Sequence, residues 1–227
     1  MIVVIGSPLY RPGSVERPSG VAGLAAGIAV AATIAGGSVQ LVGRVGEDPA
    51  GDATLLALSD LGVGHVATLR DPARPTPVEP APIAVDAAAA PEDDPFTEAV
   101  DALADDRTSM RPGDPATLDP DDVGLALRYL DGFRVIVVAD RLSRSGLDVA
   151  VEAAAYGGAR LVAIVAAGDA GQPPPEGAIV LEAPPDDPDG IFARTVGSLA
   201  VALDGGADPA AALATAVGSA GWERSAD

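Results

Sequence analysis

The sequence predicts an α/β protein with a mostly parallel central sheet and helices on both faces of that sheet. Three continuous apolar runs, 2–5, 135–139 and 161–165, lack the polar alternation of a strand with one wet face. Such runs are typical of strands that are buried on both sides. Segments with helical spacing separate the strands, and this alternation indicates right-handed crossovers between parallel strands. At 227 residues the simplest arrangement is one domain over 1–227.

In the first part of the chain, prolines and glycines mark the boundaries between the expected elements. Three prolines and a glycine indicate a loop after the first strand, and a glycine pair closes the alanine-rich helix that follows it. In order, we expect a strand over 2–5, a loop over 7–19, a helix from 19 to about 35, a strand over 39–42, a glycine-punctuated loop over 43–51, a helix from about 52 to 61 and a strand over 66–69.

The middle of the chain interrupts this alternation. Residues 71–82 are a proline-rich connector, and 87–122 are poor in hydrophobic residues and rich in Asp and Pro, which favours loop structure. Around and after this stretch we expect a short strand over 83–85, a short helix over 96–104, a helix over 123–130, a strand over 135–139, a helix over 147–156, strands over 161–165 and 178–181, and helices over 187–204 and 208–219.

Composition excludes several classes of function. The chain has no Cys and no Lys, and its only His is His65, so thiolate, Schiff-base and Walker A chemistry are absent. A net charge of -19 argues against nucleic acid and anionic membranes as partners. No secretory signal or membrane-spanning segment is evident, and we expect a cytoplasmic protein.

The stretch 181–206 combines a strand end, an acidic proline-rich turn and a helix. Asp187 is a suitable N-cap and Pro188 suits the first helical position. Four apolar residues at helical spacing predict one buried stripe: Phe192, Val196, Leu199 and Leu203. A helix N-terminus at the carboxyl end of a strand is where α/β proteins hold anions, so this stretch is the first place to look for a functional site.

Taken in order, these segments resemble the PfkB family of carbohydrate kinases, which have the ribokinase-like fold. Residues 35–51 resemble the family signature L-G-x-x-V-x-L-x-G-x-V-G-x-D-x-x-G, and weaker matches lie at 61–77, 113–123 and 197–216. The resemblance implies a three-layer α/β/α fold with a lid that is reduced or absent in this shortened chain. It covers most of the chain and is poor at 87–110 and 166–180.

Members of the family transfer phosphate from ATP, with Mg²⁺, to a sugar or nucleoside hydroxyl. Their G-A-G-D loop supplies N–H groups for the phosphate and an Asp base. The match places Gly190, Ile191, Phe192 and Ala193 on these four positions, so only the first glycine remains as an anion-binding candidate. Ala193 cannot accept a proton, which leaves Asp187 or Asp189 as the alternative base.

The positions that would bind the sugar differ from the family pattern as well. The N-x-D after the first strand has no counterpart in residues 6–10. The G-G-x-x-x-N of the first long helix corresponds to Ala22, Gly23 and, in place of Asn, Gly27. Gly23, Gly27 and Gly46 are therefore candidate substrate-binding positions, with helix packing as the competing interpretation for the first two. No T-x-G-x-x-G precedes the acidic turn.

Three functions follow from these matches and losses. The first is a ribokinase-like protein without phosphotransferase activity, which binds a sugar or nucleoside and could form a homodimer. The second is a divergent ATP-dependent kinase that uses Asp187 or Asp189 as base. The third is a partner-binding structural subunit. The carboxylates of Asp186, Asp187 and Asp189 are the best candidates for a divalent-cation site, and we expect Asp48 to cap the helix after it.

Overall fold

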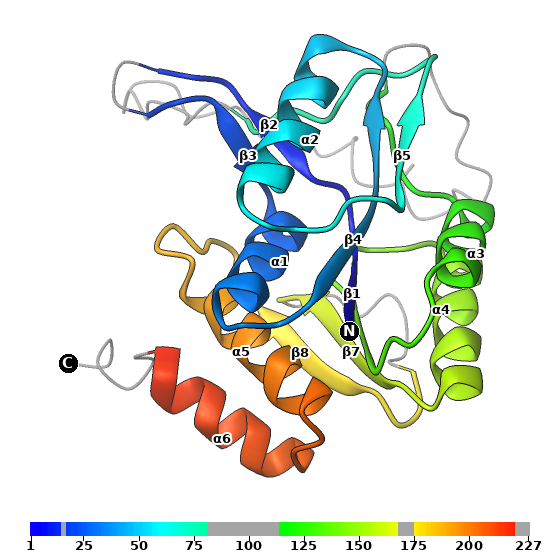
Figure 1. The fold of residues 1–227 in the computed structure, drawn as a ribbon, viewed down its shortest axis with the longest axis vertical. Helices are drawn as coiled ribbons and strands as arrows, with labels where there is room; N and C mark the ends of the chain where they lie inside the picture. The colour runs from blue at the N-terminus through cyan, green and yellow to red at the C-terminus, as the bar shows by residue number, and fades with distance from the viewer. Residues whose placement is uncertain (15–16, 81–113, 168–174, 221–227) are drawn as a thin grey trace, which may run out of the picture.

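The computed structural model describes residues 1–14, 17–80, 114–167 and 175–220. Figure 1 shows its ribbon, in which most strands lie side by side in one sheet. The elements are β1 (Ile2–Ile5), β2 (Leu9–Arg11), β3 (Gly20–Ala22), α1 (Leu24–Ile34), β4 (Val39–Gly46), α2 (Pro49–Asp60), β5 (Thr68–Asp71), α3 (Pro120–Tyr129), β6 (Val135–Val138), α4 (Arg144–Gly157), β7 (Arg160–Ala166), β8 (Ile179–Ala183), α5 (Ile191–Asp204) and α6 (Pro209–Ala220).

The central sheet has six strands in the order β5-β4-β1-β6-β7-β8 among the described residues, and every pairing is parallel. The chain builds outward from β1 through β4 to β5, and then crosses back to build outward through β6, β7 and β8. The strand order therefore reverses between β1 and β6. In open α/β sheets the connections diverge at this point and leave a crevice at the carboxyl ends of the two strands.

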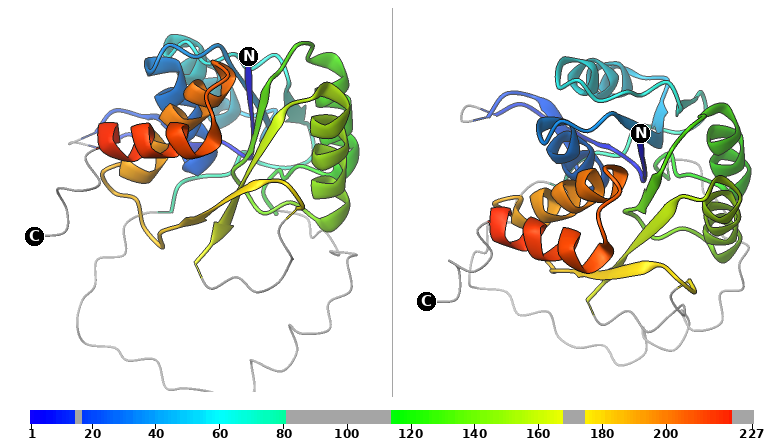
Figure 2. Two further views of the ribbon diagram at one scale, coloured as in Figure 1. Left: turned by 90° about the horizontal axis from the view of Figure 1, so that it is seen from below. Right: turned by 60° about the horizontal axis from the view of Figure 1, so that its bottom comes forward.

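The side chains of β1 show why the sheet is covered on both faces. Ile2 and Val4 belong to the core shared with α1, α5 and α6, whereas Val3 and Ile5 belong to the core shared with α3 and α4. All four side chains are fully buried. Figure 2 shows the two helical layers on opposite sides of the sheet. The predicted three-layer α/β/α class is thus confirmed.

A separate two-stranded antiparallel sheet, β2–β3, projects from the central sheet (Figure 1). Tyr10 of β2 also pairs with Val78. This hairpin corrects two predictions: 7–19 is not all loop, and the following helix begins at Leu24 rather than near residue 19. The backbone breaks at Gly23, which has φ +89°, a conformation that side chains disfavour.

Other boundaries move by a few residues. β4 continues to Gly46, and α2 begins at Pro49, so most of the predicted loop over 43–51 is regular structure. α5 begins at Ile191 rather than Pro188, because residues 187–190 form a turn that ends at Gly190 with φ +63°. The strand predicted at 83–85 and the helix predicted at 96–104 lie outside the described residues. No described helix has both the length and the apolar character that crossing a membrane requires.

Helices α1 and α5 cross at very short range because glycines face the contact. A Cβ built on Gly197 would lie 2.7 Å from the backbone nitrogen of Ala32 and 2.8 Å from the Cβ of Ala31. A Cβ on Gly27 would lie 3.3 Å from that of Ala193. The buried stripe predicted from residue 192 to residue 203 packs beside this crossing, and the helix-packing interpretation of Gly27 is supported by its geometry.

We expect Gly197→Ala to lower the free energy of unfolding by about 1–3 kcal/mol, because the added methyl must separate two backbones. Urea titration of the variant and the wild type measures this. Gly218→Ala on α6 is the matched control, since a Cβ added there would meet no atom within 4 Å. It should leave stability unchanged or raise it by up to about 1 kcal/mol. Equal effects at the two positions would contradict close packing of α1 on α5.

Candidate active-site cleft

A cleft of about 960 Å³ lies where the β2–β3 hairpin, the start of α1 and the start of α5 meet. Its walls include Gly23, which is the N-cap of α1, Gly27 within α1, and the acidic turn from Asp186 to Gly190. A second cavity of about 360 Å³ lies at the carboxyl ends of β6 and β7. Leu24 and Ala183 line both, so the two cavities adjoin. Together they occupy the crevice that the sheet topology predicts.

The N-terminus of α5 already holds an anion, and that anion belongs to the protein. The Asp187 carboxylate accepts hydrogen bonds from the backbone N–H groups of Phe192 (3.0 Å) and Ala193 (2.9 Å). As predicted, the Asp187 carboxylate pairs with free N–H groups of the first turn of α5. The N-cap is Gly190 rather than Asp187, so Asp187 reaches these groups from the turn before the helix. A negative charge at this end of a helix is stabilised by the helix dipole. These N–H groups are the ones that the resemblance makes a phosphate cradle.

The residues that match the family's base and sugar-binding Asn face each other. Ala193 is buried on α5, and its Cβ is the nearest atom to a Cβ built on Gly27 of α1. Neither side chain offers a polar atom. At the two positions where the resemblance implies polar side chains, the chain carries only hydrogen and methyl groups in close packing.

Asp186 and Asp189 are exposed on the wall of the cleft, whereas Asp187 is half-buried. Arg194 donates to the backbone carbonyl of Asp189. In the part of the chain that the structure describes, no group of three His, Cys, Asp or Glu side chains is arranged to hold a metal ion. The structure therefore lends no support to the cation site predicted at Asp186, Asp187 and Asp189.

Gly46 lies at the end of β4, away from the cleft residues. Its N–H donates to Thr76 Oγ1 at 2.9 Å, and a Cβ there would lie 2.6 Å from the carbonyl oxygen of Arg74. Asp48 caps α2 by accepting from the Gly51 N–H, as predicted, and also accepts from the N–H and hydroxyl of Thr76. Partial burial acts to raise the pKa of Asp48, but these hydrogen bonds outweigh it and hold the pKa below its usual value.

Asp140 is a candidate that the sequence analysis did not single out. It is separated from the end of β6 by one residue, Ala139, and lines the smaller cavity beside the end of β1. Its carboxylate accepts from the Ser7 N–H at 2.6 Å, a bond that joins the two strands at the reversal of strand order. Burial raises the pKa of Asp140, and the Ser7 hydrogen bond only partly offsets this. A carboxyl with a perturbed pKa in a crevice is a typical functional group.

One signal in the sequence could have identified Asp140. It is the first charged residue after the apolar run 135–139, and the carboxyl ends of buried parallel strands point toward ligand sites. What the sequence could not supply is the identity of the neighbouring strand. The proximity of Asp140 to Ser7 depends on β6 pairing with β1 across a sequence separation of more than a hundred residues.

No protein-family model and no curated protein matches the chain. Solved structures do. Ribokinase from Arabidopsis thaliana, in complex with ribose and ATP, is 14% identical with a TM-score of 0.59, covering 96% of this chain and 90% of that one. A putative ribokinase II from E. coli is 13% identical with a TM-score of 0.58, covering 95% and 90%. Fructokinase from Vibrio cholerae O395 is 17% identical with a TM-score of 0.53, covering 96% and 95%. At these identities the likeness shows the ribokinase-like fold.

Asp187→Ala should lower the free energy of unfolding by about 1 kcal/mol, the usual cost of removing a helix cap. The variant should also gain stability from added inorganic phosphate, because the two backbone N–H groups become free. Thermal melts with and without phosphate measure both effects. Asp186→Ala is the matched control, because Asp186 is exposed and precedes the capping residue. A phosphate response identical in the two variants would show that Asp187 does not occupy an anion site.

Asp140→Asn should raise stability at neutral pH. A raised pKa means that the folded state holds the neutral carboxyl better than the charged one. The charged wild-type residue therefore costs stability above its folded pKa, and that cost vanishes as pH falls toward the unfolded value of about 3.9. Asn carries no charge and keeps an oxygen for the Ser7 N–H. Urea titrations between neutral and acidic pH should show an advantage that shrinks on acidification.

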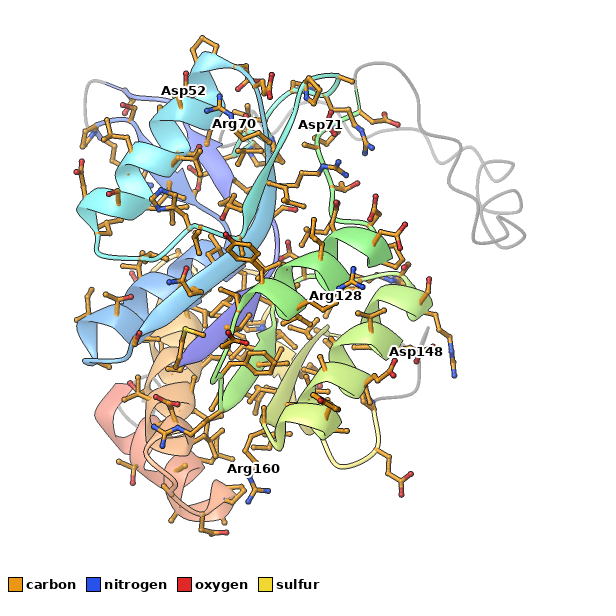
Figure 3. All side chains as sticks on the ribbon, turned by 45° about the vertical axis from the view of Figure 1, so that its right-hand side comes forward. Asp52, Arg70, Asp71, Arg128, Asp148 and Arg160 are labelled. Carbon is orange, nitrogen blue, oxygen red and sulfur yellow. The ribbon has the colours of Figure 1, made fainter. Side chains whose placement is uncertain are left out.

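The matched control is Asp148→Asn on α4, whose side chain points to solvent (Figure 3). It should show no such pH-dependent difference. A variant at residue 140 that is less stable than the wild type at neutral pH would contradict the assignment of a costly buried charge.

Proposed function

We propose that this chain is a degenerate ribokinase-like protein that binds a sugar or nucleoside and does not transfer phosphate from ATP. The observation that carries the proposal is the Asp187 carboxylate on the N–H groups of Phe192 and Ala193. Phosphoryl transfer depends on oriented donors that are free to stabilise charge on the phosphate. Donors already bound to a carboxylate of the chain cannot do so, and a phosphate brought beside Asp187 would meet a like charge.

The absence of a base at position 193 supports the same conclusion. A general base must reach the hydroxyl that attacks the phosphate, within about 2.6–3.2 Å or through one water. Ala193 has no proton acceptor in its side chain, and its methyl group packs against Gly27. The two alternative bases predicted from the sequence differ in whether their carboxylates are already hydrogen-bonded. Asp187 accepts from the N–H groups at the start of α5, whereas the side chain of Asp189 is exposed.

Ligand binding is supported by the two adjoining cavities. The larger cavity, of about 960 Å³, is large enough for a sugar or nucleoside. The smaller cavity adjoins it and is lined by Asp140. A carboxylate with one backbone donor can still accept from ligand hydroxyl groups. Hydroxyl-rich ligands would supply the hydrogen bonds that this half-buried carboxylate lacks.

The second candidate function is a divergent kinase that requires ATP and Mg²⁺ and uses Asp189 as base. The observation in its favour is the position of Asp189, exposed on the cleft wall one residue before the N-cap of α5. In that case Asp187 would have to leave the helix N-terminus when ATP binds.

A panel of sugars and nucleosides tests both functions. Thermal melts should show stabilisation by at least one panel member, about 2.7 kcal/mol at 100 times its Kd, and Asp140→Ala should weaken that ligand about tenfold. ADP release from ATP and Mg²⁺ over the same panel should stay at the level of a blank without protein.

Two results would contradict the proposal. ADP release that is abolished by Asp189→Asn and kept by Asp186→Asn would favour the kinase. A melt that does not respond to any sugar or nucleoside would show that the hydroxyl-binding site is absent.

A further inference from the structure

Two arginines of the β2–β3 hairpin line the larger cleft. Arg11 is the last residue of β2, and Arg17 lies in the turn that leads to β3. Within the described ranges neither guanidinium forms an ion pair or donates a hydrogen bond. The hairpin wall therefore brings two guanidinium groups to the cleft, with one carboxylate, that of Glu79, lining the cleft from the segment beside β2.

Arg11 is held in place by packing rather than by an acceptor. Its Nε is buried and has no hydrogen-bond partner in the structure. The guanidinium lies over Gly20 of the paired strand, where a Cβ would come within 2.9 Å of the Arg11 Nη2 atom. A buried donor without a partner is unfavourable unless something else supplies the acceptor. The cleft is the side from which an acceptor can arrive, because Arg11 lines it.

Other arginines of this acidic chain show how readily partners are found. Arg44 binds Asp122 at 2.8 Å, and Arg134 binds Asp204 at 3.0 Å. Even on the surface, Arg70 of β5 meets Asp52 of α2 at 2.7 Å (Figure 3). Arg128, Arg144 and Arg160 also form no ion pair among the described residues, but all three are exposed, whereas the Nε of Arg11 is buried. Three acids line the same cleft on the wall formed by the turn before α5, and Glu79 lines it beside β2.

We infer that the hairpin wall binds an anionic group of the ligand, a phosphate monoester or a carboxylate, through Arg11 and Arg17. The inference rests on the proposed function, because it places the hydroxyl groups of the same ligand toward Asp140. A guanidinium offers a planar fork of donors that matches both anions. The ligand class is thus a sugar phosphate or a sugar acid rather than a neutral sugar.

The test measures binding by calorimetry to ribose, ribose 5-phosphate, ribonate and inorganic phosphate. Ribose 5-phosphate or ribonate should bind at least about tenfold more tightly than ribose, because charge-assisted hydrogen bonds are added. Arg11→Gln should remove that gain and leave the affinity for ribose within about twofold. Arg11→Lys keeps the positive charge but loses the paired guanidinium donors, so it should retain part of the gain in affinity for the anionic ligands. Raising the salt concentration should weaken the anionic ligands only.

The matched control is Arg160→Gln, an exposed arginine at the start of β7, far from the hairpin (Figure 3). It should change none of the affinities. Equal binding of ribose and its anionic derivatives would overturn the inference and leave the proposed function intact. Arg11-dependent binding of inorganic phosphate without binding of any sugar would support the anion site and count against sugar binding. No binding of any of the four compounds would overturn the inference and count equally against the proposed function.

Discussion

The close crossing of α1 and α5 is the contact on which the architecture of the cleft depends. Gly27 and Gly197 let the two helices approach until side chains on one meet the backbone of the other. Both helices begin beside the carboxyl edge of the sheet, so this crossing brings their N-termini and the preceding turns together around one cleft. A wider crossing would separate the hairpin wall from the acidic turn, and the core of α1, α5 and α6 would lose the dense packing that its small residues provide.

The residues at this contact also determine which groups reach the cleft. Position 193 lies beside Gly27 at the cleft wall, and its methyl group has no atom able to accept a proton. The donors of the first turn of α5 are used by Asp187, which stabilises the helix start that this packing needs. The carboxylate that stabilises the start of α5 is therefore also the group that occupies its N–H donors, and under the proposed function helix stability and the loss of phosphoryl transfer share this contact.

The sequence predicted the sheet and its layers because buried parallel strands are visible as uninterrupted apolar runs such as 2–5 and 135–139. It failed where pairing decides structure. The segments 9–11 and 20–22 are too short for their residue pattern to predict strands. They are strands because they pair with each other. Asp187 was predicted to cap α5, but the turn through Gly190 could not be foreseen, since a left-handed glycine sets the helix start. Asp140 was missed because its significance arises from β6 lying beside β1.

Asp140 and Asp187 show how one residue type acquires opposite roles. The charge of Asp187 is compensated by two backbone donors at a helix N-terminus. Among the described residues Asp140 has a single donor, the Ser7 N–H, and burial raises its pKa. Ligand hydroxyl groups that donate to Asp140 would stabilise its charged form and lower its pKa again. By linkage, such binding must release protons at acidic pH and strengthen as pH rises through the pKa of the free protein. A neutral ligand held elsewhere in the cleft would lack this coupling, so proton release on binding distinguishes a ligand at the strand reversal from one at the helix termini.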